Sequence, residues 1–134
     1  MVNFVKVKRN INFGENPGER FVARLYRGTD ISLDHLAEDI SNATTIAFPD
    51  VIACLKALEM NISKYIQNGQ AVKLGYLGSF IPAIKAKSQE NADDVNADTI
   101  KRFWCRFFPS TDFKRELGKC KFSLTDLNVK GIIK

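Results

Sequence analysis

The sequence contains few of the residue types on which metal sites and disulfide frameworks depend. Its 134 residues include one histidine and three cysteines, Cys54, Cys105 and Cys120, with no Cys-x-x-Cys pair. An odd number of widely spaced cysteines argues against a disulfide framework and against a zinc site. We therefore expect reduced, structural cysteines, with Cys54 on the apolar stripe of a helix, and no metal or other cofactor.

Residues with the pattern of a catalytic centre are also lacking. The one histidine, His35, falls between Asp34 and Leu36 on the side of a predicted helix that faces solvent. Acid–base catalysis needs a titratable group whose pKa is adjusted by an enclosed environment. The carboxylates of the predicted helices instead lie beside lysines or serines, as on a solvated surface. We expect no enzymatic activity and no small-molecule substrate.

Long apolar runs are missing as well. No segment approaches the roughly 20 apolar residues that a membrane-spanning helix needs. The first ten residues, MVNFVKVKRN, alternate apolar with basic side chains and lack the continuous apolar stretch of a secretory signal. A length of 134 residues with 45% hydrophobic and 26% charged residues is typical of one globular domain. We expect a cytoplasmic protein that makes no contact with membranes.

The N-terminal segment has the pattern of paired strands. Residues 2–9 and 21–26 alternate apolar and polar side chains, and NFGENPGER between them holds two glycines and a proline. This combination predicts a β-hairpin. The glycines do not indicate a phosphate-binding loop, because no Gly-Lys-Ser/Thr follows and the next segment is strand-like.

Two helices are predicted after the hairpin. From Ser32, a suitable N-cap, apolar residues recur at i, i+3, i+4 and i+7, which predicts a helix ending near Ala43. A longer apolar stripe begins after Pro49, a residue favoured in a first helical turn. Gly69 is expected to end this second helix.

The stretch VKLGYLGSF, residues 72–80, joins the helices to a second sheet. Val72 and Leu74 alternate with Lys73 as in a half-buried strand, and Gly75 and Gly78 allow a tight turn. The pattern therefore predicts a short strand, a glycine turn and a returning strand.

Two longer strands and a last helix are predicted beyond this turn. Pro82 places the strand of residues 80–86 at a sheet edge or beside a bulge, because proline cannot donate to a ladder. The strand at 100–108, IKRFWCRFF, mixes apolar and basic residues on both faces, so periodicity does not say which face is buried. Ser110 is expected to cap a helix that ends at Gly118. The segments 121–124 and 129–133 alternate weakly, and whether they add a strand or fray is left open.

Charge is distributed unevenly along the chain. The net charge is +3 over residues 1–30, zero over 31–87, −4 over 88–99 and +6 over 100–134. A concentration of positive charge towards both ends suggests an acidic partner such as nucleic acid. The acidic segment, SQENADDVNADT, is polar throughout apart from Val95 and is expected to form a loop or tip.

The basic residues near the two longer strands are the best candidates for a binding site. Together with Trp104, they would allow a strand pair to follow a phosphate backbone and to present an apolar group to a base step. Two of them also lie near a helix start whose free amides can hold phosphate. From charge alone, a solubilising role is equally consistent with them. The candidates are Lys85, Lys87, Lys101, Arg102, Arg106, Lys114 and Arg115.

The order of these features resembles the bacterial histone-like HU and IHF family of DNA-binding proteins. The resemblance covers residues 31–118, and the hairpin before it with the junction RGTDISLDHLAEDI looks like the extended HU-like proteins of Bacteroides-type bacteria. The residues that carry it are Val72, Leu74, Gly78, Phe80, Phe107, Pro109 and Lys114.

This resemblance implies an α+β fold and a function. We expect a single HU-like domain over residues 1–134, with an N-terminal β-hairpin extension (1–30), a core (31–118) and a C-terminal tail (119–134). The core would hold two helices, a three-stranded sheet with a protruding two-stranded arm at about 84–103, and a short last helix. The family forms intertwined homodimers that bind double-stranded DNA in the nucleoid with little sequence preference. The seven basic candidates would contact phosphates.

The chain departs from the family at Phe108 and Thr111, where lysine is usual, in the altered turn Gly75-Tyr76-Leu77-Gly78, and most clearly at the arm tip. The family's arm tip usually carries a proline and basic residues, whereas residues 91–96 here have neither, and four carboxylates lie at or beside this tip. Negative charge there would repel phosphate. An alternative is therefore an HU-fold module for protein interaction, with weakened DNA binding, that uses the N-terminal hairpin and the acidic tip. The carboxylates are Glu90, Asp93, Asp94 and Asp98.

Overall fold

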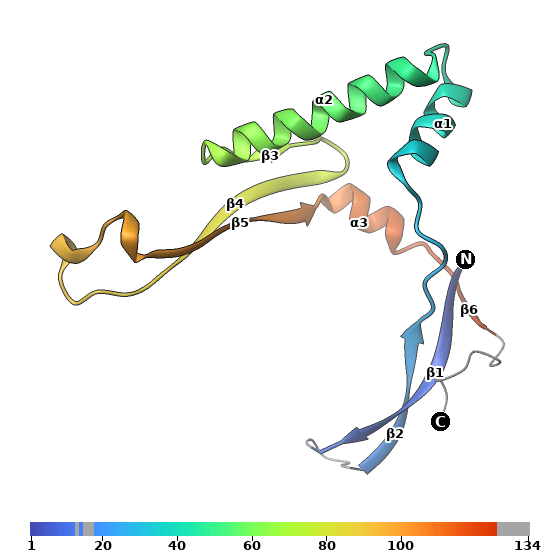
Figure 1. Ribbon diagram of the computed structural model, residues 1–134. Helices are drawn as coiled ribbons and strands as arrows, with labels where there is room; N and C mark the ends of the chain where they lie inside the picture. The colour runs from blue at the N-terminus through green and yellow to red at the C-terminus, as the bar shows by residue number, and fades with distance from the viewer. Residues whose placement is uncertain (13, 15–17, 126–134) are drawn as a thin grey trace. The chain divides into compact units, whose positions relative to one another are not determined.

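The computed structural model describes residues 1–12, 14 and 18–125, and the chain divides into two compact units. The first unit combines residues 1–30 with the chain from Leu117 onward, and the second contains Ile31–Glu116. The N-terminal extension and the C-terminal segment therefore belong to the same unit, although they lie at opposite ends of the sequence. Figure 1 shows the elements of both units.

The first unit is a three-stranded sheet. Strands β1 (Val2–Ile11) and β2 (Gly18–Leu25) pair antiparallel, which confirms the predicted hairpin. Strand β6 (Phe122–Leu124) pairs in parallel with the other edge of β1, in the order β2-β1-β6. The segment at 121–124, left open by its weak alternation, thus adds a strand. The similar segment at 129–133 lies outside the described residues.

Two helices begin the second unit, and both begin and end near the residues that the local sequence predicts. Helix α1 (Leu33–Ala43) is capped by Ser32, whose side chain accepts a hydrogen bond from the backbone N–H of His35 at 3.1 Å. Helix α2 (Phe48–Gln67) has its proline in the first turn, and Gly69 follows it with a φ of 79°. The predicted boundaries of both helices are confirmed. Their buried residues are Ala37, Val51 and Ile66.

The second sheet contains β3 (Val72–Lys73), β4 (Gly78–Ala86) and β5 (Ile100–Pro109) in that order. Short β3 pairs only with the start of β4, where Val72 lies opposite Phe80. Pro82 therefore has a neighbouring strand, β5, on one side only, so its missing N–H leaves no gap in a ladder. Beyond β3 the pair β4–β5 continues alone as a two-stranded ribbon (Figure 1).

Gly78 is required where the glycine turn meets the sheet. Its φ is 143°, and a Cβ at this position would lie 2.2 Å from the carbonyl oxygen of Phe108. Close approach of two backbones and a conformation disfavoured for other residues both demand glycine here. The turn is closed by a hydrogen bond from the N–H of Leu74 to the carbonyl of Gly78, at 2.8 Å.

The far end of the ribbon carries the acidic segment. It contains two single-turn 3₁₀ helices, η1 (Ala92–Asp94) and η2 (Ala97–Thr99), in place of the predicted irregular loop. The side chain of Asn96 caps η2 by accepting from the N–H of Asp98 at 2.9 Å. Every residue from 88 to 98 is exposed.

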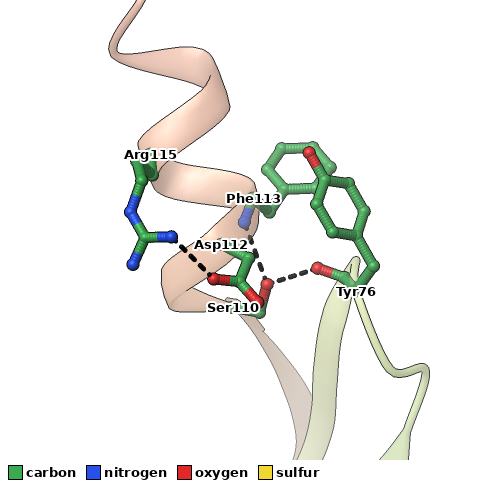
Figure 2. A network of polar contacts seen from close by, with 5 residues as sticks. All are labelled: Tyr76, Ser110, Asp112, Phe113 and Arg115. Atoms are coloured by element: carbon green, nitrogen blue, oxygen red, sulfur yellow. Dashed lines mark hydrogen bonds and ion pairs between the residues drawn. The ribbon is translucent and has the colours of Figure 1, made fainter.

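Helix α3 (Thr111–Leu117) follows β5, as predicted. The side chain of Ser110 accepts from the N–H of Phe113 at 3.0 Å and donates to the carbonyl of Tyr76 (Figure 2). The rings of Tyr76 and Phe113 also lie 5.7 Å apart, centroid to centroid. These contacts attach the start of α3 to the glycine turn.

Candidate nucleic-acid interface

One face of the β4–β5 ribbon combines basic side chains with the tryptophan. In the antiparallel register Lys85 lies opposite Arg102, Ala83 opposite Trp104 and Ile81 opposite Arg106. Residues directly opposite each other point to the same side of a sheet, and so do residues two apart on one strand. Three of the predicted cations therefore share one face with Trp104. We call this the ribbon face: Lys85, Arg102, Trp104 and Arg106.

The opposite side of the sheet is apolar and faces α2. Phe80 and Phe107 lie opposite each other there, with ring centroids 5.1 Å apart. Together with Phe103 and with Ile62 and Ile66 of α2, they line a hollow of about 600 Å³, which Trp104 also reaches. The phenylalanine side of β5 therefore lies towards α2, although Phe103 and Phe107 remain 47% and 46% exposed in the single chain.

The tryptophan of the ribbon face is in contact with both arginines. The guanidinium carbon of Arg102 lies 4.2 Å from the Trp104 ring centroid, and that of Arg106 lies 5.4 Å away. Such cation–π contacts restrict the arginine side chains without neutralising their charge. Four residues along a strand span ~13 Å, so the two arginines are far enough apart at their backbones to reach different phosphates.

Two further predicted residues lie on the ribbon outside this register. Lys101 is the extra residue of a β-bulge, because Lys85 pairs with Arg102 while Ala86 pairs with Ile100. A bulge redirects the side chains around it. Lys87 follows the end of β4, and its N–H donates to the carbonyl of Thr99 at 2.8 Å. Both lysines are exposed next to the acidic segment.

The remaining two candidates lie on α3 and form a different surface. Arg115 makes an ion pair with Asp112 at 3.0 Å (Figure 2), so part of its charge is neutralised locally. The cap by Ser110 occupies the N–H of Phe113, one of the amides that we expected to be free for phosphate. Lys114 is exposed. The structure therefore does not add α3 to the ribbon face.

Features typical of metal-binding and membrane-spanning proteins are missing from the described part of the chain. No group of three or more His, Cys, Asp or Glu side chains there could hold a metal ion. No helix of that part is long and apolar enough to cross a membrane. All three cysteines are free thiols and exposed. The expectation that Cys54 is packed is therefore wrong for the single chain, because the apolar stripe of α2 is only partly covered.

Comparisons with known proteins agree with this fold. The family model described as "HU domain fused to wHTH, Ig, or Glycine-rich motif" matches residues 1–123. A solved structure from Bacteroides vulgatus ATCC 8482, described as a "putative bacterial DNA binding protein", is similar with a TM-score of 0.64 and 8% sequence identity. The similarity covers 91% of this chain and 47% of that one, so this chain spans about half of its length. At this identity the likeness is one of fold. No curated protein matches the sequence.

Proposed function

The chain is a member of the HU-HIG family, and from this premise we propose that it is an architectural protein that binds double-stranded DNA with little sequence preference. The similar structure from Bacteroides vulgatus, described as DNA-binding, supports the same class of partner. Bacterial DNA lies in the nucleoid, and the proposal places the protein there.

The ribbon face is the observation that carries the proposal. Lys85 and Arg102 lie opposite each other on it, Arg106 lies opposite the uncharged Ile81, and the half-buried ring of Trp104 lies between the two arginines. Cations on such a surface bind phosphates and release counterions, which gives affinity without reading the base sequence. The indole provides an apolar surface for a sugar or base edge. On this proposal the arginines and Lys85 position the duplex, while Lys87, Lys101, Lys114 and Arg115 are peripheral contacts.

We also propose that the protein acts as a homodimer. In the second unit the buried apolar side chains among the described residues are Ala37, Val51 and Ile66. Large apolar residues around the hollow remain half exposed, with Phe103 at 47% and Phe107 at 46%. A domain of this size normally buries more than half of the surface of its unfolded chain. A second copy packed against this side would complete the core and bring two ribbons to one DNA segment.

The acidic tip favours a second candidate function, a module that binds a basic protein. All four of its carboxylates are exposed, and residues 88–99 contain no basic residue to offset them. On this alternative the tip and the N-terminal sheet capture the partner, and DNA binding is weak. The two functions differ in the sign of the ligand charge, so they can be separated experimentally.

Intrinsic fluorescence provides the test, because Trp104 is the single tryptophan of the chain. A random-sequence duplex added at low salt should change its emission and raise the anisotropy of a labelled duplex, and added NaCl should reverse both. The W104F variant should still bind, since the cations remain. Absence of any anisotropy change would refute DNA binding. An anisotropy change with unaltered Trp104 emission would refute the ribbon face as the contact surface.

The dimer has a separate test. Sedimentation equilibrium should give twice the 15.1 kDa mass of one chain at micromolar concentration. A mass of one chain would remove the dimer from the proposal.

A further inference from the structure

The three-stranded sheet of the first unit has two chemically different faces. Phe4 lies opposite Leu25 and Lys8 opposite Phe21, so these residues share one face, which carries the large apolar side chains together with lysines and the carboxylate of Glu19. Arg9 lies opposite Arg20, and Arg24 opposite the buried Val5. By the alternation of side chains, all three arginines lie on the other face. All three are exposed.

Arg9 and Arg20 form an unusual cross-strand pair. Directly opposite residues in an antiparallel pair have Cβ atoms about 5 Å apart, and like charges at this distance destabilise the sheet. Among the described residues, no carboxylate makes an ion pair with either arginine. The side chain of Arg20 donates one hydrogen bond, to the backbone carbonyl of Glu19 at 3.2 Å. Within the described part of the chain, no other hydrogen bond of either guanidinium is found, which leaves most of their donors for an anion.

Nearby cations of the same unit behave differently. Lys8 makes an ion pair with Glu19 at 2.8 Å, and Arg27 makes one with Asp30 at 3.4 Å. The ion pairs recorded among the described residues of this unit thus involve cations outside the arginine set. Arg9 and Arg20 repel each other, and an anion bound between them would relieve this repulsion.

The third arginine extends the site along the strand. Arg24 follows Arg20 by four residues on β2, which corresponds to ~13 Å along a strand. The residue between them on the same face is Val22, so no acidic side chain interrupts this row. Guanidinium groups bind phosphate through two parallel hydrogen bonds, with a geometry that lysine lacks. Spaced arginines suit a ligand that carries many phosphates better than a single anion.

We propose that Arg9, Arg20 and Arg24 form a second DNA-contacting surface, the arginine face, in the unit that does not contain the ribbon face. This inference rests on the proposed function, because the ligand is the same duplex. An acidic protein is the less suitable partner, since the large apolar residues that would anchor it lie on the opposite face of the sheet. The arginine face contacts phosphates and adds affinity without sequence preference.

The experiment compares two triple variants of the full chain. R9Q/R20Q/R24Q removes the arginine face. K6Q/K8Q/R27Q removes the same charge from the same unit but leaves the three arginines in place; of its residues, Lys8 and Arg27 already make ion pairs. For each, affinity for a random duplex is measured by anisotropy over a range of salt concentrations, and Trp104 emission is recorded at saturation.

Loss of three phosphate contacts should make the negative slope of log affinity against log salt shallower by about 2.7. Binding should weaken roughly 100-fold at physiological salt. The control triple should bind nearly as the wild type does. The emission change at saturation should be retained in R9Q/R20Q/R24Q, because the ribbon face is intact. R9K/R20K/R24K should restore the slope, since it keeps the charge. Removing the Arg9–Arg20 repulsion should leave the melting temperature no lower than that of the wild type.

Several results would overturn the inference. If the wild type binds and R9Q/R20Q/R24Q binds with an unchanged slope, the arginine face is refuted while the proposed function stands. Equal losses in both triples would show an effect of net charge alone. Salt-sensitive self-association that occurs without DNA and is lost in R9Q/R20Q/R24Q would show that the face binds acidic residues of another copy. If the wild type does not bind DNA at all, the proposed function itself fails.

Discussion

Replacing Arg102 and Arg106 by glutamine is the most direct test of the ribbon face. Both residues lie on the same side of β5 with Trp104 between them, and both guanidiniums contact its ring. Glutamine keeps a polar side chain on an exposed strand but removes the charge. The variant therefore changes the electrostatics of the face while leaving the apolar side, with Phe80 and Phe107, untouched.

The expected magnitude follows from counterion release. Each lost phosphate contact lowers the salt slope by about 0.9, so two contacts lower it by about 1.8. Between 1 M and 0.15 M salt, this difference amounts to roughly 30-fold in affinity, or about 2 kcal/mol. Loss of the cation–π contacts adds a smaller effect, because they occur at a partly exposed site.

Anisotropy of a labelled random duplex, measured at four or more salt concentrations, gives both the affinity and its salt slope. The matched control is K56Q/K64Q on α2, which removes the same charge from a different surface; Lys56 pairs with Glu59 and Lys64 lies 5.5 Å from the ring centroid of Tyr65. The change in salt slope of the control should be less than a third of the change in R102Q/R106Q. Equal slopes for R102Q/R106Q and the wild type would refute the assignment of the ribbon face.

Two further variants test the fold and the tip. Gly78→Ala should cost at least ~2 kcal/mol in urea unfolding, because its Cβ would overlap the carbonyl of Phe108 in a strained conformation. Gly69→Ala, with a positive φ but open space around the Cβ, should cost about 1 kcal/mol, and equal losses would contradict the close approach at Gly78. Neutralising the four carboxylates of the tip should raise DNA affinity several-fold at low salt if the tip approaches phosphate. An unchanged DNA affinity, together with loss of binding to a basic peptide, would favour the protein-interaction module. This last variant is E90Q/D93N/D94N/D98N.

Much of the secondary structure was predictable because its determinants are local. Ser32 caps α1 through an N–H three residues away, and Gly69 ends α2 through its own backbone conformation. Ser110 likewise caps α3 by accepting from the N–H of Phe113. Such interactions depend on residues within one turn, so the residue types and their spacing are sufficient to predict them. The family resemblance rested on the same local features.

The candidate site was predictable only in part. The seven basic residues could be named from composition, but their grouping could not. A bulge takes Lys101 out of the register of Arg102, and an ion pair with Asp112 reduces the charge available on Arg115. Neither is visible in a pattern that mixes apolar and basic residues on both faces of a strand. The arginines of the N-terminal sheet were missed, because a row of like charges is apparent only once Arg9 is known to lie opposite Arg20.

The sequence by itself determined the ends of the helices, the N-terminal hairpin and the glycine turn, together with the uneven distribution of charge. Tertiary structure decided which strands pair, in which register, and therefore which side chains share a face. β6 pairs with β1 although nearly the whole chain separates them, and α2 lines one hollow together with Phe103 and Phe107 of β5. These outcomes depend on contacts between distant segments, whose free energy comes from burying apolar surface that no local pattern specifies. The ribbon face is defined in this way, because the register of β4 and β5 places Lys85, Arg102, Trp104 and Arg106 on one side.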